Sequence, residues 1–401
     1  MQVHTNSANP STKLAELRRR KLSGDQARRI AEIRSLYAHA KSLAASLIPT
    51  DENEALDAVM KEIDELTIAT PPLQGGTHQL YRMSELEAEL RWAKSLTGDS
   101  SKVVVKQLEQ ARDLGPMRYI AAAQDPSVLG ELRRDFPNFG SVLDFIEHRL
   151  LLCRMGPAKL FRLPPVLLSG PPGVGKTWFT KKLAQALIDI PYAQADLSQS
   201  TPGFAITGLD AAYDTGRPGL VWRTLQNPCA SPIILFDEVD KVQFGGRDGG
   251  VGFLLGLLEK SSATRFQDAA MRLPIDISGV LWFATCNDSS LLERPVVSRF
   301  RVFDIASPTA TQMRRVVQSV NRELLAAEDW SSVFDTDLPE PMLTALQNGT
   351  PREIKQKLED AYACAAVAGR RHLTIDDLNC SHGAPADKAF PMGFINTNAR
   401  P

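Results

Sequence analysis

Near the middle of the chain stands Gly170-Pro171-Pro172-Gly173-Val174-Gly175-Lys176-Thr177, which matches the pattern G-x-x-x-x-G-K-[ST]. An apolar run over 165–169 precedes it, and a helical pattern opens at Trp178. A glycine loop between a strand and a helix lets backbone N–H groups converge on a phosphate, and the helix N-terminus adds about half a positive charge. The stretch therefore predicts a nucleotide-phosphate site that extends from Gly170 to Trp178.

Two side chains of this loop have expected roles. Lys176 would reach the β- and γ-phosphates of a nucleotide, and the Thr177 hydroxyl would bind Mg²⁺. An ordinary glycine turn before a helix is the alternative interpretation.

Paired acids end a second apolar run, over 232–241. Apolar residues followed by Asp237 and Glu238 indicate a buried parallel strand that presents its acids at the carboxyl edge of a sheet, where ligands bind. We expect Asp237 to hold Mg²⁺, directly or through water, and Glu238 to polarise the water that attacks the γ-phosphate. A strand that simply ends in solvated acids is the alternative.

Two polar side chains lie next to other predicted strands. The apolar run 280–286 ends at Asn287, whose amide would orient the lytic water or sense the γ-phosphate, with a plain Asx turn as the alternative. Arg299 precedes a short strand at 302–305. It could lie at a subunit edge and reach a neighbour's γ-phosphate, or it could form a surface ion pair.

A third arginine begins a helix near the C-terminus. Thr350 is the expected N-cap and Pro351 the first helical residue, so Arg352 falls in the first turn. A cation is unfavourable there because of the helix dipole. Arg352 is therefore predicted to face an anion, unless Glu353 simply neutralises it.

Composition places the chain among ordinary soluble proteins. The 401 residues predict roughly two to three domains, and 43% hydrophobic with 23% charged residues suits a large core. The net charge of −1 gives no general affinity for polyanions.

Five scattered cysteines without C-x-x-C spacing indicate a reducing compartment and no structural zinc. With neither a signal peptide nor a long apolar run in view, we expect a cytoplasmic protein with no membrane partner.

The first part of the chain has a helical period. Apolar residues recur at three- and four-residue steps over 14–47, 56–66 and 80–96, with a loop marked by Pro71-Pro72 and Gly75-Gly76. Residues 117–161 are also expected to be helical. A basic cluster, residues 18–21 with Arg28 and Arg29, could touch nucleic acid, but it lacks interleaved aromatic residues, so a solvated helix face is the default interpretation.

Residues from about 139 to 378 resemble an AAA+ ATPase module, and within that superfamily the ATPase part of the Lon proteases. The resemblance is carried by 170–177 as Walker A, 233–241 as Walker B, Asn287 as sensor 1, Ser298-Arg299-Phe300 as the arginine-finger turn, and 349–352 as the start of the sensor 2 helix. It implies an α/β P-loop core with a parallel five-stranded sheet, a C-terminal helical lid, and the cofactors ATP and Mg²⁺. It also implies a homo-oligomeric ring, with a hexamer favoured, in which Arg299 acts in trans and Arg352 in cis.

The helical periodicity of the first part and the resemblance of the rest together divide the chain into four parts. These are a helical N-terminal module with a disordered start (1–115), an α/β nucleotide-binding domain (116–306), a helical lid (307–380) and a flexible tail (381–401). Tyr213 falls where the family has its substrate-gripping pore loop, although Asp214 replaces the apolar residue that usually follows. The chain stops shortly after the lid, so no intrinsic peptidase is expected, and a separate peptidase could work with the ring.

These expectations combine into one function with two alternatives. We expect a Mg²⁺-dependent ATPase that couples ATP hydrolysis to the remodelling, unfolding or threading of a protein partner, without intrinsic protease activity. One alternative is a DNA-associated ATPase, such as a loader or a defence-system motor, that uses the basic cluster. The other is a nucleotide-switched scaffold that binds ATP and turns it over slowly.

Overall fold

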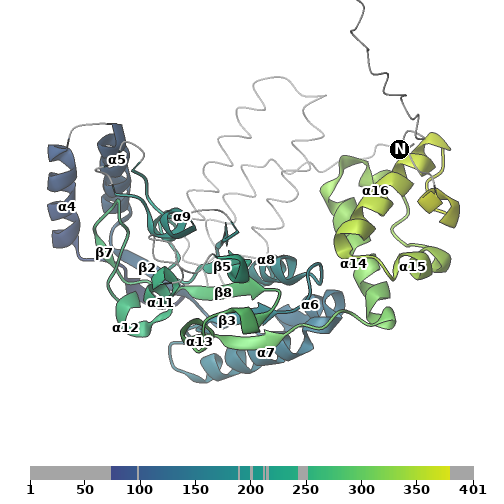
Figure 1. The fold of residues 1–401 in the computed structure, drawn as a ribbon, viewed down its shortest axis with the longest axis horizontal. Coiled ribbons are helices and arrows are strands. Elements are labelled where there is room, and N and C mark those ends of the chain that lie inside the picture. Colours follow the sequence, from purple (N-terminus) through teal and green to yellow (C-terminus); the bar gives the residue numbers. More distant parts are fainter. Residues whose placement is uncertain are drawn as a thin grey trace, which may run out of the picture.

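The computed structural model describes residues 74–379, apart from 97–98, 188–189, 199–201, 211–212, 214–215 and 243–251. The predicted helices over 14–47 and 56–66, the basic cluster, Asp214 and the predicted tail lie outside the described residues. A sheet occupies the middle of the described part, with a helical hairpin at one end and a group of C-terminal helices at the other (Figure 1).

The central sheet has five parallel strands in the order β4-β5-β8-β3-β9. Their bounds are β3 (Val166–Ser169), β4 (Tyr192–Asp196), β5 (Ile233–Asp237), β8 (Leu281–Cys286) and β9 (Arg301–Asp304). The predicted five-stranded parallel sheet is thus confirmed. After β3 the chain crosses to the edge strand β4 and returns through β5 and β8, so the carboxyl ends of β3, β5 and β8 lie together, where open α/β sheets bind ligands.

Alternate residues of each strand pack into cores on opposite faces of the sheet. Ile233 and Leu235 of β5 join a core with α7 (Gly140–Met155) and α8 (Lys176–Ala186). Ile234 and Phe236 join a core that contains residues of α10 (Leu220–Thr224) and α11 (Gly252–Leu258). All four of these β5 side chains are fully buried, which explains why the strand reads as a continuous apolar run.

The N-terminal helices α4 (Met83–Ser95) and α5 (Asp99–Leu114) are present as predicted. The loop predicted at 75–76 is wrong, because β1 (Gln74–Gln79) pairs antiparallel with β2 (Met117–Ala121). That pair also corrects the helical prediction at the start of 117–161. Glycines in β1 concealed the strand, and a register shift between Gln74 and Gly76 accommodates them.

The C-terminal helices form a lid with a hydrophobic core of its own. They are α14 (Ala310–Ala327), α15 (Glu340–Leu346) and α16 (Pro351–Val367). Arg322 pairs with Asp135 at 2.8 Å, and Lys182 of α8 pairs with Glu323 at 3.2 Å, so two ion pairs join the lid to the nucleotide-binding part. The boundaries of the four parts stay predictions.

Short elements complete the described chain. They are α6 (Gly130–Asp135), α9 (Pro202–Thr207), α12 (Lys260–Ala263), α13 (Arg294–Val297), the strands β6 (Phe266–Gln267) and β7 (Pro274–Ile275), and six 3₁₀ turns. The antiparallel pair β6–β7 confirms the hairpin predicted at 264–277. Among the described residues, no helix is both long and apolar enough to cross a membrane.

Candidate nucleotide-binding site

The glycine loop follows β3 and ends at the first residue of α8. Gly175 caps α8 with φ +95°, a left-handed conformation that favours glycine. A Cβ on Gly170 would come within 2.2 Å of the Ile305 carbonyl oxygen, so only glycine fits between β3 and the chain beyond β9. Pro171, Pro172 and Gly173 are exposed, whereas Val174 is buried. The first part of the loop is therefore open to solvent, and the Val174 side chain anchors the loop in the core.

Lys176 lies folded into this loop. Its Nζ donates to the carbonyl oxygens of Gly170 at 2.6 Å and Pro171 at 2.9 Å, and lies 3.4 Å from Oδ1 of Asn287. The residue is only 8% exposed. Burial lowers the pKa of Lys176 below its ordinary value, although acidic groups, Asp240 and Asp237 among them, act in the opposite direction. The loop thus holds an ammonium group in a buried position at the strand ends.

Asp237, the last residue of β5, accepts hydrogen bonds from three side chains. Thr177 Oγ1 lies 2.9 and 3.0 Å from its two carboxylate oxygens, Gln194 Nε2 donates at 2.9 Å, and Thr285 Oγ1 donates to Oδ1. Burial and the charge of Asp237 raise the pKa of Tyr192 to about 12, and its hydroxyl donates to Gln194 at 3.0 Å. The predicted metal ligands Thr177 and Asp237 are therefore adjacent and held from several sides.

This donor set suits Mg²⁺. The ion prefers hard oxygen ligands, and in nucleotide enzymes it is held by one or two carboxylates together with substrate phosphates and water. Thr177 and Asp237 supply a hydroxyl and a carboxylate within 3.0 Å of each other. Over the residues that the structure describes, no group of three or more His, Cys, Asp and Glu could hold a metal ion. The site fits an ion that nucleotide and water would complete.

Glu238 follows Asp237 in an unusual backbone conformation. Its φ of +57° and ψ of +47° are left-handed, which costs a residue with a side chain about 1–3 kcal/mol. Its N–H donates to Thr285 Oγ1 at 3.1 Å, and its own side chain is exposed. The strand therefore turns sharply at Glu238 and leaves this carboxylate open to solvent beside the half-buried Asp237.

Asn287 lies directly after β8, level with the acids of β5. Its N–H donates to Asp240 Oδ2 at 3.0 Å, and its side-chain oxygen faces Lys176. The structure thus brings together Lys176, Thr177, Asp237 and Asn287, with Glu238 next to them in the chain. These residues come from three different strand ends.

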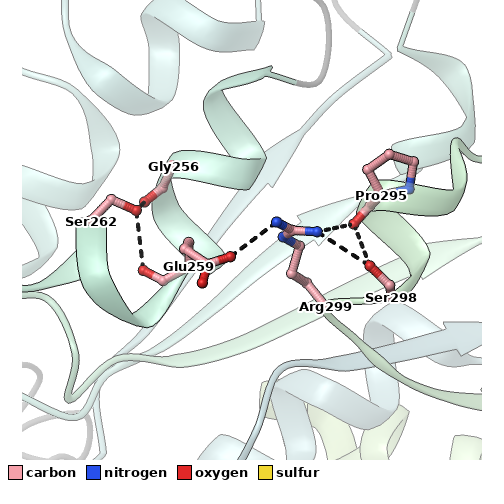
Figure 2. A network of polar contacts seen from close by, with 6 residues as sticks. All are labelled: Gly256, Glu259, Ser262, Pro295, Ser298 and Arg299. Carbon is pink, nitrogen blue, oxygen red and sulfur yellow. Dashed lines mark hydrogen bonds and ion pairs between the residues drawn. The ribbon is translucent and has the colours of Figure 1, made fainter.

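Arg299 lies apart from that group, and its interactions are drawn in Figure 2. Its Nη2 pairs with Glu259 Oε2 at 3.0 Å, while Nη1 donates to Pro295 O at 2.9 Å and to Ser298 Oγ at 3.3 Å. Nε is buried and has no partner among the described residues. Within one chain, Arg299 therefore forms the surface ion pair that the sequence left open. Its action on a neighbouring subunit stays a prediction.

Arg352 lies on the lid, in the first turn of α16. Thr350 caps this helix by accepting from Glu353 N at 3.3 Å, and Glu353 Oε2 accepts in return from Thr350 N at 2.8 Å. Glu353 is thus engaged with the cap, and Arg352 is exposed with no hydrogen bond or ion pair to the residues that the structure describes. A Cβ on Gly173 would lie 3.1 Å from Thr350 Cγ2, so the start of α16 meets the glycine loop.

Trp178 does not project into open space at the loop. Its ring lies 5.0 Å from that of Phe136, and it packs against both the α7–α8 core and the lid core. The residue therefore joins the two parts on either side of the loop. Its predicted contact with the nucleotide stays a prediction.

Tyr213 lies on a loop that is closed at its base. Leu209 and Arg217 form a bridge there, and Asp268 accepts from Gly219 N at 2.7 Å. Burial raises the pKa of Asp268 to about 6, although bonds from three backbone N–H groups oppose this. The Tyr213 side chain is 63% exposed, as a gripping residue would need to be, but nothing in the structure identifies what it grips.

Sequence reasoning missed three side chains of this site. Gln194 and Thr285 contact Asp237, and Asp240 bonds to the backbone of Asn287. Gln194 and Thr285 sit inside predicted strands, and only the register of those strands brings them level with Asp237. A cavity of about 650 Å³ lies between α6, α8 and α14. It is separate from this site, because Lys182 and Gln185, which line it, lie toward the C-terminal end of α8, whereas Lys176 is the first residue of that helix.

Comparisons with known proteins agree with this geometry. A family model described as "ATPase family associated with various cellular activities (AAA)" matches residues 166–306. The mitochondrial Lon protease homolog of Kluyveromyces lactis is 30% identical over 215 residues, which cover 52% of this chain and 19% of the relative. That of Caenorhabditis elegans is 26% identical over 273 residues, which cover 65% and 26%. The matches span about a fifth to a quarter of these relatives.

Similarity to solved structures is weaker. The Thermotoga maritima RuvB Holliday junction branch migration motor matches 60% of this chain and 67% of its own, at 14% identity and a TM-score of 0.39. The family match covers the sheet, the glycine loop and the paired acids. Residues 166–306 therefore form an AAA ATPase domain with distant similarity to the ATPase region of the Lon proteases.

Proposed function

We propose that this chain is a Mg²⁺-dependent ATPase that works as a homo-oligomeric ring and uses hydrolysis to remodel, unfold or thread a protein partner. The observation that carries the ATPase part is the convergence of Lys176, Asp237 and Asn287 at the ends of three neighbouring strands. A phosphate-binding loop, a metal-binding carboxylate and a polar amide are the parts that phosphoryl transfer to water requires.

The loop would bind ATP through its backbone and through Lys176. Lys176 Nζ now donates to two loop carbonyls, and a phosphate would replace these with stronger, charge-assisted bonds. Thr177 and Asp237 would hold Mg²⁺, which when bound neutralises charge on the phosphate oxygens.

Glu238 would accept a proton from water as the water oxygen bonds to the γ-phosphorus. The bond from the γ-phosphorus to the bridging oxygen breaks, and its electron pair leaves with ADP. Asn287 would orient the water or contact the γ-phosphate. Because Glu238 is exposed and Asp237 is satisfied by three donors, the two carboxylates suit different roles, one as base and one as ligand.

The position of Arg299 supports the proposed ring assembly. Its guanidinium lies at the surface on the turn after α13, away from the site of its own chain, and would reach the γ-phosphate of a neighbour. Arg352, on the lid helix that meets the glycine loop, would act on the nucleotide of its own chain. The relatives are named as proteases, which favours a protein as the object moved, with Tyr213 gripping it. The absence of intrinsic protease activity stays a prediction.

A trapping experiment tests the coupling to a protein. The Glu238→Gln variant, carrying a photo-crosslinking residue in place of Tyr213, is held with Mg-ATP inside cells and then irradiated. We expect polypeptide crosslinked at position 213, and none when Lys176→Ala is added. Crosslinks to DNA would favour the DNA-associated ATPase, and assemblies without any crosslink would favour the scaffold. Either result would contradict threading.

A further inference from the structure

Thr285 lies at the point where the pairing of β5 with β8 stops. The register of the two strands ends at Phe236 and Ala284, so Asp237 and Glu238 leave the ladder. Thr285 is the next residue of β8, and it is 1% exposed. A buried hydroxyl at this place must find partners, since leaving it unbonded is unfavourable.

The hydroxyl of Thr285 bonds to both acidic residues of β5. The N–H of Glu238 can only donate, so Thr285 Oγ1 accepts from it, at 3.1 Å. The hydroxyl proton then goes to Asp237 Oδ1. One side chain thereby fixes the carboxylate of Asp237 and the peptide plane that leads into Glu238.

The bond from Glu238 N–H to Thr285 Oγ1 supports an unusual backbone conformation at Glu238. Its left-handed conformation is strained for a residue with a side chain and persists only if its surroundings hold it. The bond from Glu238 N to the Thr285 side chain joins β5 to β8 after the ladder between these strands has ended at Phe236. The direction in which the exposed Glu238 side chain leaves the strand follows from that conformation.

A second bond of the same kind runs in the opposite direction. Asp240, beyond the turn, accepts from the N–H of Asn287, the residue that follows β8. The ends of β5 and β8 are thus joined by two side-chain to backbone bonds after their ladder has stopped. The Walker B acids and the sensor amide are held as one unit.

We propose that Thr285 is a positioning residue for ATP hydrolysis, because its hydroxyl sets the placement of Asp237 relative to Glu238. The proposal rests on the proposed ATPase function and adds to it a residue that acts through Asp237 and Glu238. Losing the hydroxyl would displace both the metal-binding carboxylate and the base, while the glycine loop would still bind nucleotide.

The test uses two substitutions at one position in the full chain. Thr285→Val keeps the shape of the side chain and removes the hydroxyl, and Thr285→Ser keeps the hydroxyl and removes the methyl group. We expect Thr285→Val to lower kcat for Mg-ATP by about 10- to 100-fold and to raise the Mg²⁺ concentration for half-maximal turnover. Thr285→Ser should recover most of both quantities. The affinity for a fluorescent ATP analogue without Mg²⁺ should change less than about twofold in either variant.

Thr224→Val is the matched control. Thr224 has a partly buried hydroxyl that bonds only within its own helix, to Leu220 O at 2.7 Å, and it lies outside the site. The kcat of the Thr224→Val variant should equal that of the wild type. A Thr285→Val variant with unchanged kcat and Mg²⁺ dependence would overturn the inference, and so would a Thr285→Ser variant as impaired as Thr285→Val. If the wild type itself turned over no Mg-ATP, the proposed function would fail first and this inference with it.

Discussion

At the ends of β3, β5 and β8 the polar side chains bond to one another, whereas the two arginines predicted to act on phosphate lie apart from them. Asp237 accepts from three side chains of its own chain, and Lys176 is 8% exposed. Among the residues that the structure describes, Arg299 pairs with Glu259 and its own turn alone, and Arg352 is exposed. One chain therefore brings the proposed binding and metal groups together, while Arg299 requires a neighbouring subunit, and Arg352 a bound nucleotide, to acquire their proposed roles.

The largest effect is expected at the strand ends. Replacing Glu238 with Gln removes the proposed base and leaves the contacts of Lys176 and Asp237 in place. Turnover of Mg-ATP should fall roughly a thousandfold while nucleotide affinity stays within about threefold. Steady-state kinetics with a fluorescent-nucleotide titration measures both. Unchanged turnover would remove Glu238 from the chemistry.

The next effect concerns the arginine edge. The Arg299→Ala variant should lose at least about a hundredfold in turnover and still bind nucleotide, because it removes a donor to developing phosphate charge. Mixing variant with wild-type subunits distinguishes action on a neighbouring subunit from action within the same chain. In mixed assemblies the rate should fall faster than the fraction of wild-type subunits. A rate proportional to that fraction would place Arg299 outside a shared site.

A smaller effect is expected at Gln194, an exposed residue of the strand-end group. Gln194→Ala removes one hydrogen bond to Asp237, and a net bond of about 1 kcal/mol corresponds to roughly a fivefold change. We expect the Mg²⁺ concentration for half-maximal turnover to rise by about that factor at unchanged nucleotide affinity. Magnesium titrations of turnover would show it. An unchanged midpoint would mean that Thr177 and Thr285 hold Asp237 without help.

The smallest effect is expected at Glu259. Its pair with Arg299 is partly exposed, 48% for Glu259 and 33% for Arg299, and such pairs contribute about 0–1 kcal/mol. Glu259→Gln should change the free energy of unfolding by less than about 1 kcal/mol and turnover by less than about twofold. Urea unfolding and the turnover assay check the two. A loss as large as that of Arg299→Ala would show that Glu259 is part of how Arg299 works.

The same contrast separates what the sequence could predict from what it could not. The glycine loop, the apolar run before Asp237 and the helix cap at Thr350 are local patterns, and each lies in the element predicted for it. The apolar run before Asp237 predicted a buried parallel strand, and the resemblance to AAA+ modules predicted the five-stranded parallel sheet. β1 could not be found because its two glycines hide the strand and its partner β2 lies about forty residues away.

Contacts between residues far apart in the chain could not be predicted from the sequence for the same reason. Thr285 meets Asp237 through strand register, and Arg299 meets Glu259, which lies between α11 and α12, forty residues earlier in the chain. Such pairs depend on tertiary packing, which no short pattern encodes. The motifs named the candidate site residues, but they did not name Gln194, Thr285 and Asp240, which contact those residues.

The central claim is that the ends of β3, β5 and β8 form a site for Mg²⁺-dependent ATP hydrolysis. The most direct measurement is phosphate release by the purified chain with Mg-ATP, compared with the same chain carrying Lys176→Ala and with the wild type in excess EDTA. The account predicts steady release by the wild type and none above background in the other two. Equal release from wild type and Lys176→Ala, or none from the wild type across a range of protein concentrations, would contradict it.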